Sequence, residues 1–269
     1  MKILVFTEKP FAPAAVKAIA NVVDAAGADL EVVEQGTRED LLKAVADVEG
    51  LIVRSDKIDG EVMAAAPKLK VIVRAGAGYD NIDLAAATAH NVVVENTPGQ
   101  NSNAVAELVF GMAVMMARNG YNGKSGSELK GKRLGIHAFG QVGRNVARIA
   151  KGFGMEVSAL DPYCPDEVIV EAGVKPVHSV EELYKDNDYV SLHIPATDET
   201  RKSVGYDLVM KLPKGGTLIN TARKEVIDEE GLIRAMNERP DIKYVADIRP
   251  DTGDQMNEMF AERVFLSLI

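Results

Sequence analysis

Short apolar runs alternate with amphipathic, alanine-rich stretches along the chain, and this alternation constrains the possible folds more than any other feature. In the first part of the sequence the runs are three or four residues long, rich in β-branched side chains, and lie at 3–6, 30–33, 51–53, 71–73 and 92–94. The stretches between them include helical patterns at 13–26, 41–48 and 84–89. Parallel strands are buried on both faces and need helical crossovers, so the alternation predicts a series of parallel βα units.

A second series of the same kind follows a turn-rich segment at 96–101, which contains Asn, Thr, Pro and Gly. A long helical pattern at 102–118 comes next, and then a loop rich in Gly, Asn and Ser at 119–131. Further strands are predicted at 133–137, 156–160, 189–192, 217–220 and 243–246. We therefore predict an α/β protein of two doubly wound parallel-sheet domains, one flavodoxin-like and one Rossmann, which face each other across a cleft. We place these domains at 1–98 and 99–269.

Charge and cysteine content exclude several classes of protein. The formal net charge is −9 and no run of Lys and Arg forms a basic stripe, so we expect neither a nucleic-acid nor a membrane partner. The single cysteine, Cys164, cannot form an internal disulfide, which is typical of a reducing compartment. The apolar N-terminal run is too short for a signal peptide, and no later stretch approaches a membrane span. These features indicate a cytoplasmic protein that acts on a small molecule, and no metal site is expected.

A glycine-containing turn at the start of the second series is typical of dinucleotide binding. Gly140 and Gly143 occupy the second and third positions of a G-x-G-x-x-G pattern, and Ala138 occupies the first. Gly140 would let the backbone approach a pyrophosphate, and Gly143 would let helix and strand pack closely. The amides of Gln141 and Val142, at the helix N-terminus, would meet the phosphate charge. Alanine at the first position requires a permissive φ, and an ordinary βα turn is the alternative interpretation.

An acidic residue at the end of the next strand strengthens the interpretation. Asp161 follows the strand at 156–160, about 20 residues after the glycines, where an acid binds the ribose hydroxyls. Its carboxylate would repel the 2′-phosphate of NADP, and no arginine follows directly, so the sequence predicts NAD as the cofactor. The alternative is that Asp161 and Pro162 only initiate a turn.

Six further segments occur in an order and at a spacing typical of one protein family. They read V-R-S-D-K at 53–57, R-A-G-A-G-Y-D-N-I-D at 74–83, N-T-P-G-Q-N-S at 96–102 with Ala-Glu at 106–107, S-L-H-I-P-A-T at 191–197, I-N-T-A-R at 219–223 and Asp-Glu at 228–229. Together they resemble the D-isomer-specific 2-hydroxyacid dehydrogenase family over nearly the whole chain. Arg54 and the R-A-G-x-G loop are most similar to the short phosphoglycerate dehydrogenases, which lack a regulatory domain.

The resemblance implies oxidation of 3-phosphoglycerate to 3-phosphohydroxypyruvate by NAD, the first step of serine biosynthesis. It implies that 1–98 binds the substrate and that 99–269 binds the cofactor. Arg223 would bind the substrate carboxylate and C2 oxygen, because a planar guanidinium makes bidentate contacts. Arg54 and Arg74 would face the phosphate and carboxylate, with help from the backbone amides of Ala75 and Gly76.

The resemblance also assigns cofactor contacts beyond the glycine turn. The segment His193, Ile194 and Pro195 would line the adenine side, and Asp247 would bind the nicotinamide carboxamide. Contacts near the nicotinamide ring would come from Thr221, Ala222 and Arg223. Family members commonly form homodimers through the cofactor domain, so we expect a homodimer with the helix at 102–118 at its interface.

The C-terminal part departs from the family pattern. Family members follow the aspartate with Glu-Pro and later carry a catalytic histidine, whereas here Asp247 precedes Ile-Arg-Pro and the chain stops at 264–269. None of the four histidines, His90, His137, His178 and His193, replaces the missing base convincingly. A helix that returns to the first domain is also missing, which would expose an apolar face there.

We therefore expect impaired activity and stability of residues 1–269. Two alternatives stay open: a dehydrogenase for another 2-hydroxy acid, such as glyoxylate or D-lactate, and a family member that binds NAD(H) without turnover.

Overall fold

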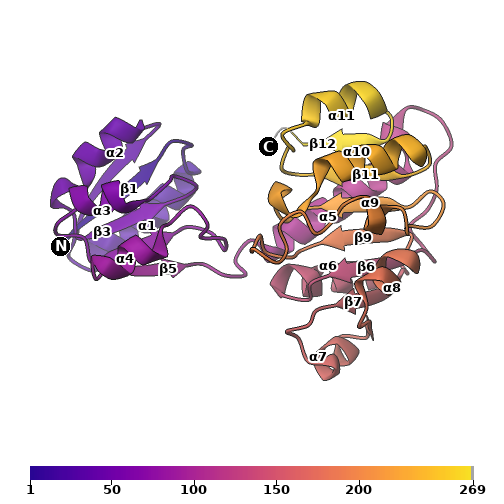
Figure 1. The fold of residues 1–269 in the computed structure, drawn as a ribbon. Coiled ribbons are helices and arrows are strands. Elements are labelled where there is room, and N and C mark those ends of the chain that lie inside the picture. The colour runs from indigo at the N-terminus through magenta and orange to yellow at the C-terminus, as the bar shows by residue number, and fades with distance from the viewer. Residues whose placement is uncertain (268–269) are drawn as a thin grey trace. The chain divides into compact units, whose positions relative to one another are not determined.

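The computed structural model describes residues 1–267, which form two compact units, Met1–Asn101 and a second unit that begins at Ser102. Figure 1 draws the first unit in indigo and purple and the second from magenta to yellow. The division follows residue 101, whereas the boundary predicted from the sequence follows residue 98. Leu268 and Ile269, the end of the segment where the family's histidine motif was expected, lie outside the described residues.

The first unit is built on a five-stranded parallel sheet with the flavodoxin-like order β2-β1-β3-β4-β5. Its strands are β1 (Lys2–Thr7), β2 (Asp29–Glu34), β3 (Gly50–Val53), β4 (Val71–Arg74) and β5 (Val93–Asn96). The register pairs Phe6 with Val53, Val53 with Arg74, and Arg74 with Asn96, so these strands end at one edge of the sheet. All pairings are parallel, which confirms the predicted architecture of this unit.

The helices of the first unit are α1 (Pro13–Ala25), α2 (Arg38–Ala44), α3 (Gly60–Ala65) and α4 (Leu84–Ala89), with a 3₁₀ turn η1 (Val45–Asp47) after α2. Helix α2 begins before the predicted start at 41, because Thr37 caps it. The Thr37 hydroxyl accepts from the Asp40 amide (3.3 Å), and the Asp40 carboxylate accepts from the Thr37 amide (2.9 Å). Helices α2, α3 and α4 cover one face of the sheet, where Leu41, Val62 and Ala87 pack in the core.

The other face of this sheet is covered incompletely by α1. An apolar hollow of about 200 Å³ lies there, and its lining includes Ile3, Val22, Ile52 and Val73. Val93 on β5 is 57% exposed, although valine side chains of parallel sheets are usually buried. The first unit therefore presents apolar surface on the α1 side of its sheet.

The second unit is built on a seven-stranded parallel sheet with the order β12-β11-β10-β9-β6-β7-β8. Its strands are β6 (Arg133–His137), β7 (Glu156–Leu160), β8 (Lys175–Pro176), β9 (Tyr189–Leu192), β10 (Thr217–Asn220), β11 (Lys243–Ala246) and β12 (Val264–Leu266). The six strands from β6 to β11 follow the Rossmann order, and β12 extends it. The five predicted strands are confirmed, whereas β8 and β12, at the two edges, were not predicted.

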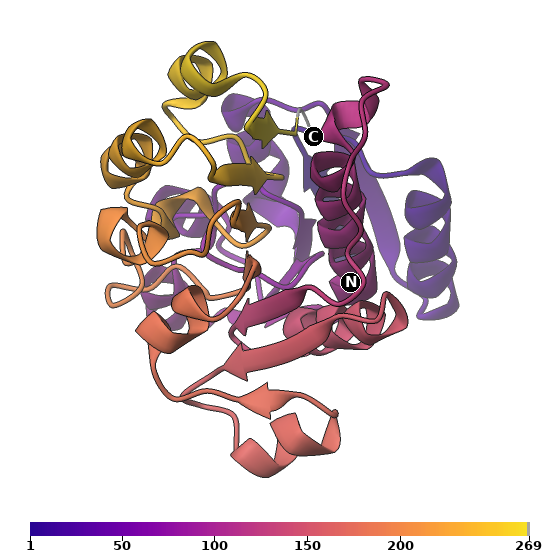
Figure 2. The same ribbon diagram turned by 90° about the vertical axis from the view of Figure 1, so that its right-hand side faces the viewer.

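Helices lie on both sides of this sheet, as Figure 2 shows in a second view. One side carries α5 (Ser102–Ala117), α6 (Gln141–Gly152) and α7 (Asp166–Glu171), and the other carries α8 (Val180–Lys185), α9 (Tyr206–Val209), α10 (Glu229–Glu238) and α11 (Gly253–Phe260). The predicted loop after α5 contains a 3₁₀ turn, η2 (Asn119–Tyr121), and another, η3 (Lys224–Val226), follows β10. No helix of the described part is long and apolar enough to cross a membrane.

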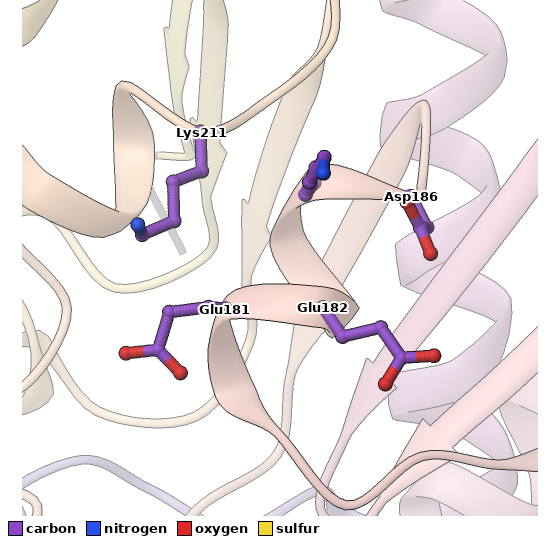
Figure 3. Close-up of a pocket in the computed structure, with 5 residues that line it drawn as sticks. Glu181, Glu182, Asp186 and Lys211 are labelled. Carbon is purple, nitrogen blue, oxygen red and sulfur yellow. The ribbon is translucent and has the colours of Figure 1, made fainter.

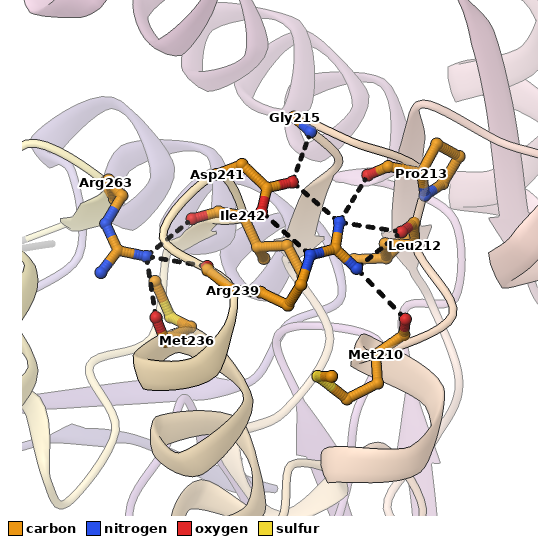
Figure 4. Close-up of polar contacts among 9 residues, drawn as sticks. All are labelled: Met210, Leu212, Pro213, Gly215, Met236, Arg239, Asp241, Ile242 and Arg263. Atoms are coloured by element: carbon orange, nitrogen blue, oxygen red, sulfur yellow. Dashed lines mark hydrogen bonds and ion pairs between the residues drawn. The ribbon is translucent and has the colours of Figure 1, made fainter.

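Two arginines, Arg239 and Arg263, donate hydrogen bonds to backbone carbonyls of the segments that precede β10 and β11 (Figure 4). Arg239 donates to the carbonyl oxygens of Met210, Leu212 and Pro213 at 3.2–3.3 Å. It also pairs with Asp241 at 2.7 Å, and this pair holds the pKa of the Asp241 carboxyl well below its usual range. Arg263 donates in the same manner to three other carbonyl oxygens, those of Met236, Arg239 and Ile242.

We expect Arg239→Ala to lower the free energy of unfolding of the second unit by about 2–4 kcal/mol, because it leaves Asp241 and several carbonyl groups without their donor. Arg234→Ala is the matched control. Arg234 is more exposed and pairs with Glu238 four residues away, so its loss should cost about 1 kcal/mol or less. Urea unfolding followed by circular dichroism measures both, and equal losses would contradict the assigned role of Arg239.

Candidate functional site

Five residues in or beside the predicted site each come directly after the carboxyl end of a parallel strand. Ala138 comes after β6, Asp161 after β7, His193 after β9, Thr221 after β10 and Asp247 after β11. The ladder continues past the strands, since the amides of Ala138, His193 and Asp247 donate to neighbouring backbone carbonyls at 2.8–3.2 Å. These residues therefore lie along one edge of the second unit's sheet, where ligands bind in open parallel sheets.

The β6–α6 turn has the backbone geometry that dinucleotide binding needs. Gly140 is the N-cap of α6, and nothing lies within 4 Å of the place where its Cβ would be. A Cβ at Gly143 would overlap the carbonyl oxygen of Ala138, so only glycine lets α6 approach β6 this closely. Gln141 and Val142 start the helix, where backbone amides have no helical partner. The turn can therefore accept a phosphate group.

Ala138 adopts a left-handed backbone conformation, with φ of +84°. The sequence-based interpretation required a permissive φ at this position, and the structure places an alanine in a region where a Cβ is unfavourable. The turn therefore keeps its shape against a local steric cost.

Asp161, directly after β7, accepts hydrogen bonds from the glycine turn and from its own loop. One carboxylate oxygen accepts from the amide of Phe139 at 2.8 Å, and the other accepts from the amide of Tyr163 at 2.9 Å. A carboxylate has about four acceptor sites, so each oxygen can accept a further hydrogen bond, such as one from a ribose hydroxyl. Asp161 thus links β7 to the glycine turn and remains able to accept from a ligand.

Asp247 shows the feature that most directly indicates a ligand. Its Oδ1 atom is buried and has no hydrogen-bond partner among the residues that the structure describes. Burial raises the pKa of this carboxyl. A buried acceptor without a donor is unfavourable, so a ligand that brings an N–H group, such as a carboxamide, would complement this oxygen.

The two histidines at this edge are held by strand-end contacts. His193 lies 3.0 Å from the Ser191 hydroxyl and 3.5 Å from that of Thr221, and burial lowers its pKa to about 3. His137 lies 3.3 Å from the Tyr184 hydroxyl, and burial lowers its pKa to about 4. Both imidazoles are therefore neutral at neutral pH.

The remaining two histidines lie at exposed positions. His90 is exposed at the end of α4, and His178 is exposed beside Asp166, with 3.3 Å between them. Within the described residues, no three His, Cys, Asp or Glu side chains converge to hold a metal ion.

Arg223 follows the turn at the end of β10, and its guanidinium donates to the carbonyl of Ala222 at 3.0 Å. Asn220 holds this turn from both sides: its amide nitrogen donates to the carbonyl of Arg223, and its amide oxygen accepts from the amide of Ala222, both at 3.0 Å. Asn220 belongs to the I-N-T-A-R segment, but the sequence alone assigned it no role. A polar amide residue at the carboxyl end of a buried strand is the signal that would have identified it.

Glu229, at the start of α10, also received no role from the sequence. Its carboxylate accepts from the amides of Asp251 (3.0 Å) and Thr252 (2.8 Å). Asp251 further pairs with Lys224. These contacts hold the segment after Asp247, where the family's Glu-Pro pair is missing.

The predicted substrate residues of the first unit line one hollow of about 520 Å³ at the carboxyl ends of β3, β4 and β5. Its lining consists of Arg54, Ser55, Arg74, Ala75, Gly76, Thr97, Gln100 and Asn101. A Cβ at Gly76 would overlap the guanidinium of Arg74, so glycine allows this arginine to fold over the loop. The structure thus brings Arg54, Arg74 and the Ala75–Gly76 backbone together in one unit.

A second hollow, of about 530 Å³, lies on the surface around α8 (Figure 3). It is lined by Glu181, Glu182, Lys185, Asp186 and Lys211. Figure 3 shows that the carboxylates of Glu181 and Glu182 extend away from each other. These two carboxylates therefore do not converge on one point in the hollow.

Comparison with known proteins agrees with these features. Residues 103–262 match the NAD binding domain of the D-isomer specific 2-hydroxyacid dehydrogenases. The crystal structure of NAD+-bound 3-phosphoglycerate dehydrogenase from Entamoeba histolytica is 47% identical, with a TM-score of 0.94, and the match covers 100% of this chain and 87% of that one.

Two curated relatives match over shorter stretches. D-3-phosphoglycerate dehydrogenase of Methanocaldococcus jannaschii is 39% identical over 78% of this chain and 43% of its own length. Hydroxypyruvate reductase of Thermotoga maritima is 38% identical over 76% of this chain and 70% of its own length. The match therefore spans less than half of the first of these relatives.

We expect opposite effects from two substitutions in the glycine turn. Ala138→Gly should raise the free energy of unfolding by about 0.5–1 kcal/mol, because glycine adopts the positive φ of residue 138 without the steric cost of a Cβ. Gly143→Ala should destabilise the unit and abolish NADH binding, because α6 must move away from β6. Thermal unfolding and the fluorescence of bound NADH measure the two effects. A stable Gly143→Ala variant with full NADH affinity would contradict this account of the turn.

We expect stability to fall in mild acid because of His137 and His193, two half-buried histidines whose pKa values are lowered. Between the ordinary imidazole pKa of about 6.5 and a folded pKa of about 4, the unfolded chain binds a proton that folded His137 does not bind. The free energy of unfolding should therefore decrease as the pH falls from 6.5 to 4, by on the order of 3 kcal/mol for His137.

His137→Gln should flatten this part of the profile of unfolding free energy against pH, with His90→Gln, at an exposed position, as the control. An unchanged slope in His137→Gln would refute the assignment.

Proposed function

This chain belongs to the D-isomer specific 2-hydroxyacid dehydrogenase family, and from that premise we propose that it oxidises 3-phosphoglycerate to 3-phosphohydroxypyruvate with NAD. The observation that carries the choice of substrate is the hollow of the first unit, where the guanidinium-bearing residues Arg54 and Arg74 line one space. Two cations in one hollow suit a substrate with both a carboxylate and a phosphate.

The residues of the second unit fit a bound NAD. We propose that the amides of Gln141 and Val142 bind the pyrophosphate, which the bare backbone at Gly140 allows to approach. Asp161 would accept from the ribose, and the unpartnered Oδ1 of Asp247 would accept from the nicotinamide carboxamide. When bound, NAD supplies the chemistry by accepting a hydride from C2 of the substrate.

The segment at 193–195, together with Thr221 and Ala222, would border the cofactor. His193 is held by Ser191 and Thr221, so its role there is to shape the edge rather than to exchange protons.

The substrate would be oriented by arginines. We propose that Arg223 binds the carboxylate and the C2 oxygen, because its planar fork can hold both at once and stabilises negative charge on that oxygen. Asn220 would position it through the turn that it holds. Arg54 and Arg74, with the amides of Ala75 and Gly76, would bind the remaining anionic groups.

The proton of the C2 hydroxyl needs an acceptor within hydrogen-bond reach. We propose that none of the four histidines serves as that acceptor. His137 and His193 contact the hydroxyls of Tyr184, Ser191 and Thr221. His90, at the end of α4, and His178, which follows β8 and contacts Asp166, are exposed.

We also propose a homodimer that forms through the second unit at α5. This helix carries partly exposed apolar side chains, among them Leu108, Val114 and Met115. Gly111 on the same helix is exposed and has nothing within 4 Å of its Cβ position, so another helix could approach it closely.

A second candidate is reduction of an unphosphorylated 2-oxo acid, and a relative named hydroxypyruvate reductase favours it. Such a substrate has no phosphate, so it would not need Arg54. A third candidate is NAD(H) binding without turnover.

NADH oxidation with 3-phosphohydroxypyruvate, compared with glyoxylate, distinguishes the three candidates. Because no histidine accepts the C2 proton, we expect low turnover. This turnover should prefer the phosphorylated substrate and be lost in Arg223→Ala. Arg54→Ala should cost about 2–5 kcal/mol in kcat/KM for the phosphorylated substrate, the range for a charge pair that loses one partner, and far less for glyoxylate.

Equal use of both substrates by the wild-type chain would support the second candidate. NADH binding without turnover on either substrate would support the third.

A further inference from the structure

We infer that the segment at residues 8–11, directly after β1, positions Arg54 for the phosphate group of the substrate, and that Phe11 is its main positioning residue. This inference rests on the proposed function, because it concerns how the first unit recognises a phosphorylated substrate. The family resemblance assigns a role to Arg54 and none to residues 8–11.

The guanidinium of Arg54 is held by hydrogen bonds from one nitrogen and by contact with an aromatic ring. Its Nη1 atom donates to the carbonyl oxygens of Lys9 (3.2 Å) and Pro10 (2.7 Å). The carbon of the guanidinium lies 5.5 Å from the centre of the Phe11 ring, within the range of a cation–π contact. The segment at residues 8–11 therefore restrains the Arg54 guanidinium through three contacts.

The opposite edge of the guanidinium is left for a ligand. Nε and Nη2 of Arg54 donate to no residue that the structure describes. These two groups present parallel N–H bonds, the arrangement that binds two oxygens of a phosphate or carboxylate. Arg54 also lines the hollow that contains Arg74 and Gly76. An oxyanion in this hollow can thus meet an arginine that is already oriented.

The segment itself is anchored to three other parts of the unit. The amide of Phe11 donates to the Glu34 carboxylate at the end of β2 (2.9 Å), and the amide of Glu8 donates to Asp56 (2.7 Å). The Thr7 hydroxyl donates to the Lys9 carbonyl (2.5 Å), which also accepts from Arg54. Because both ends are tied, the two carbonyls that hold Arg54 cannot turn away together.

The backbone of Arg54 is fixed from the other side. Asp56 is buried and accepts from the amide of Arg54 (3.3 Å), while the Asn81 amide nitrogen donates to the carbonyls of Arg54 (3.3 Å) and Asp56 (2.7 Å). Asp56 therefore joins the Arg54 loop to the segment at 8–11. A long, flexible side chain held at both ends loses less conformational freedom when it binds an anion.

The test is equilibrium binding of 3-phosphoglycerate and of D-glycerate to the full chain with NADH present. The variants are Phe11→Ala, Phe11→Tyr, Arg54→Ala and the double variant, with Val22→Ala as a control at an exposed apolar position on α1. We expect Phe11→Ala to weaken 3-phosphoglycerate binding about 3- to 10-fold and to leave D-glycerate binding unchanged.

Two further results are expected from these variants. Phe11→Tyr should retain wild-type affinity, because it keeps the ring. Phe11→Ala should have no further effect in the Arg54→Ala background, since it acts only through Arg54.

A purely structural role for Phe11 would change both ligands equally, and that result would overturn the inference. No effect of Phe11→Ala, where Arg54→Ala does weaken the phosphorylated ligand, would overturn it and leave the proposed function intact. If Arg54→Ala does not distinguish the two ligands, the proposed substrate and the inference both fail. Melting temperatures are measured for every variant, and Phe11→Leu, which keeps apolar volume without a ring, replaces Phe11→Ala if that variant does not fold.

Discussion

In the second unit, α6 can pack against β6 only because residue 143 has no side chain. A Cβ there would overlap the carbonyl of Ala138, so this close approach places the helix N-terminus at the sheet edge where the neighbouring strands also end. The turn keeps this shape even though Ala138 must adopt a positive φ. A phosphate-binding turn at this edge gives the polar residues after β7, β9, β10 and β11 a common ligand to meet.

The polar residues at that edge divide into two kinds. Asp161 and His193 make contacts within the protein, which hold the turn and shape the border of the site. Asp247 instead keeps a buried oxygen without a partner among the described residues, an arrangement that is unfavourable until a donor arrives. The first kind holds the structure of this edge, and the second leaves an acceptor that a bound ligand would satisfy.

The first unit has the same strand-end geometry, and there it gathers two arginines in one hollow. Parallel crossovers bring the loops after β1, β3 and β4 to one edge, where backbone carbonyls and an aromatic ring hold Arg54, and Gly76 makes room for Arg74. Two main-chain carbonyls and an aromatic ring, and no acidic side chain of the described residues, contact the Arg54 guanidinium. Such an arrangement keeps the arginine positive and oriented and does not neutralise it.

The sequence by itself determined the two parallel sheets and the ligand-binding turn, because both depend on local patterns. The alternation of apolar runs predicts strands and crossovers, and the spacing of Gly140, Gly143 and Asp161 is a property of one βα unit. The edge strands β8 and β12 were missed, because Lys175–Pro176 is no apolar run and the apolar run at Val264–Leu266 was assigned to the family's C-terminal pattern instead. Only the tertiary structure decided the contacts between loops, such as that of Arg54 with Pro10, 44 residues away. Such contacts depend on how the crossovers bring strand ends together, which no local pattern encodes.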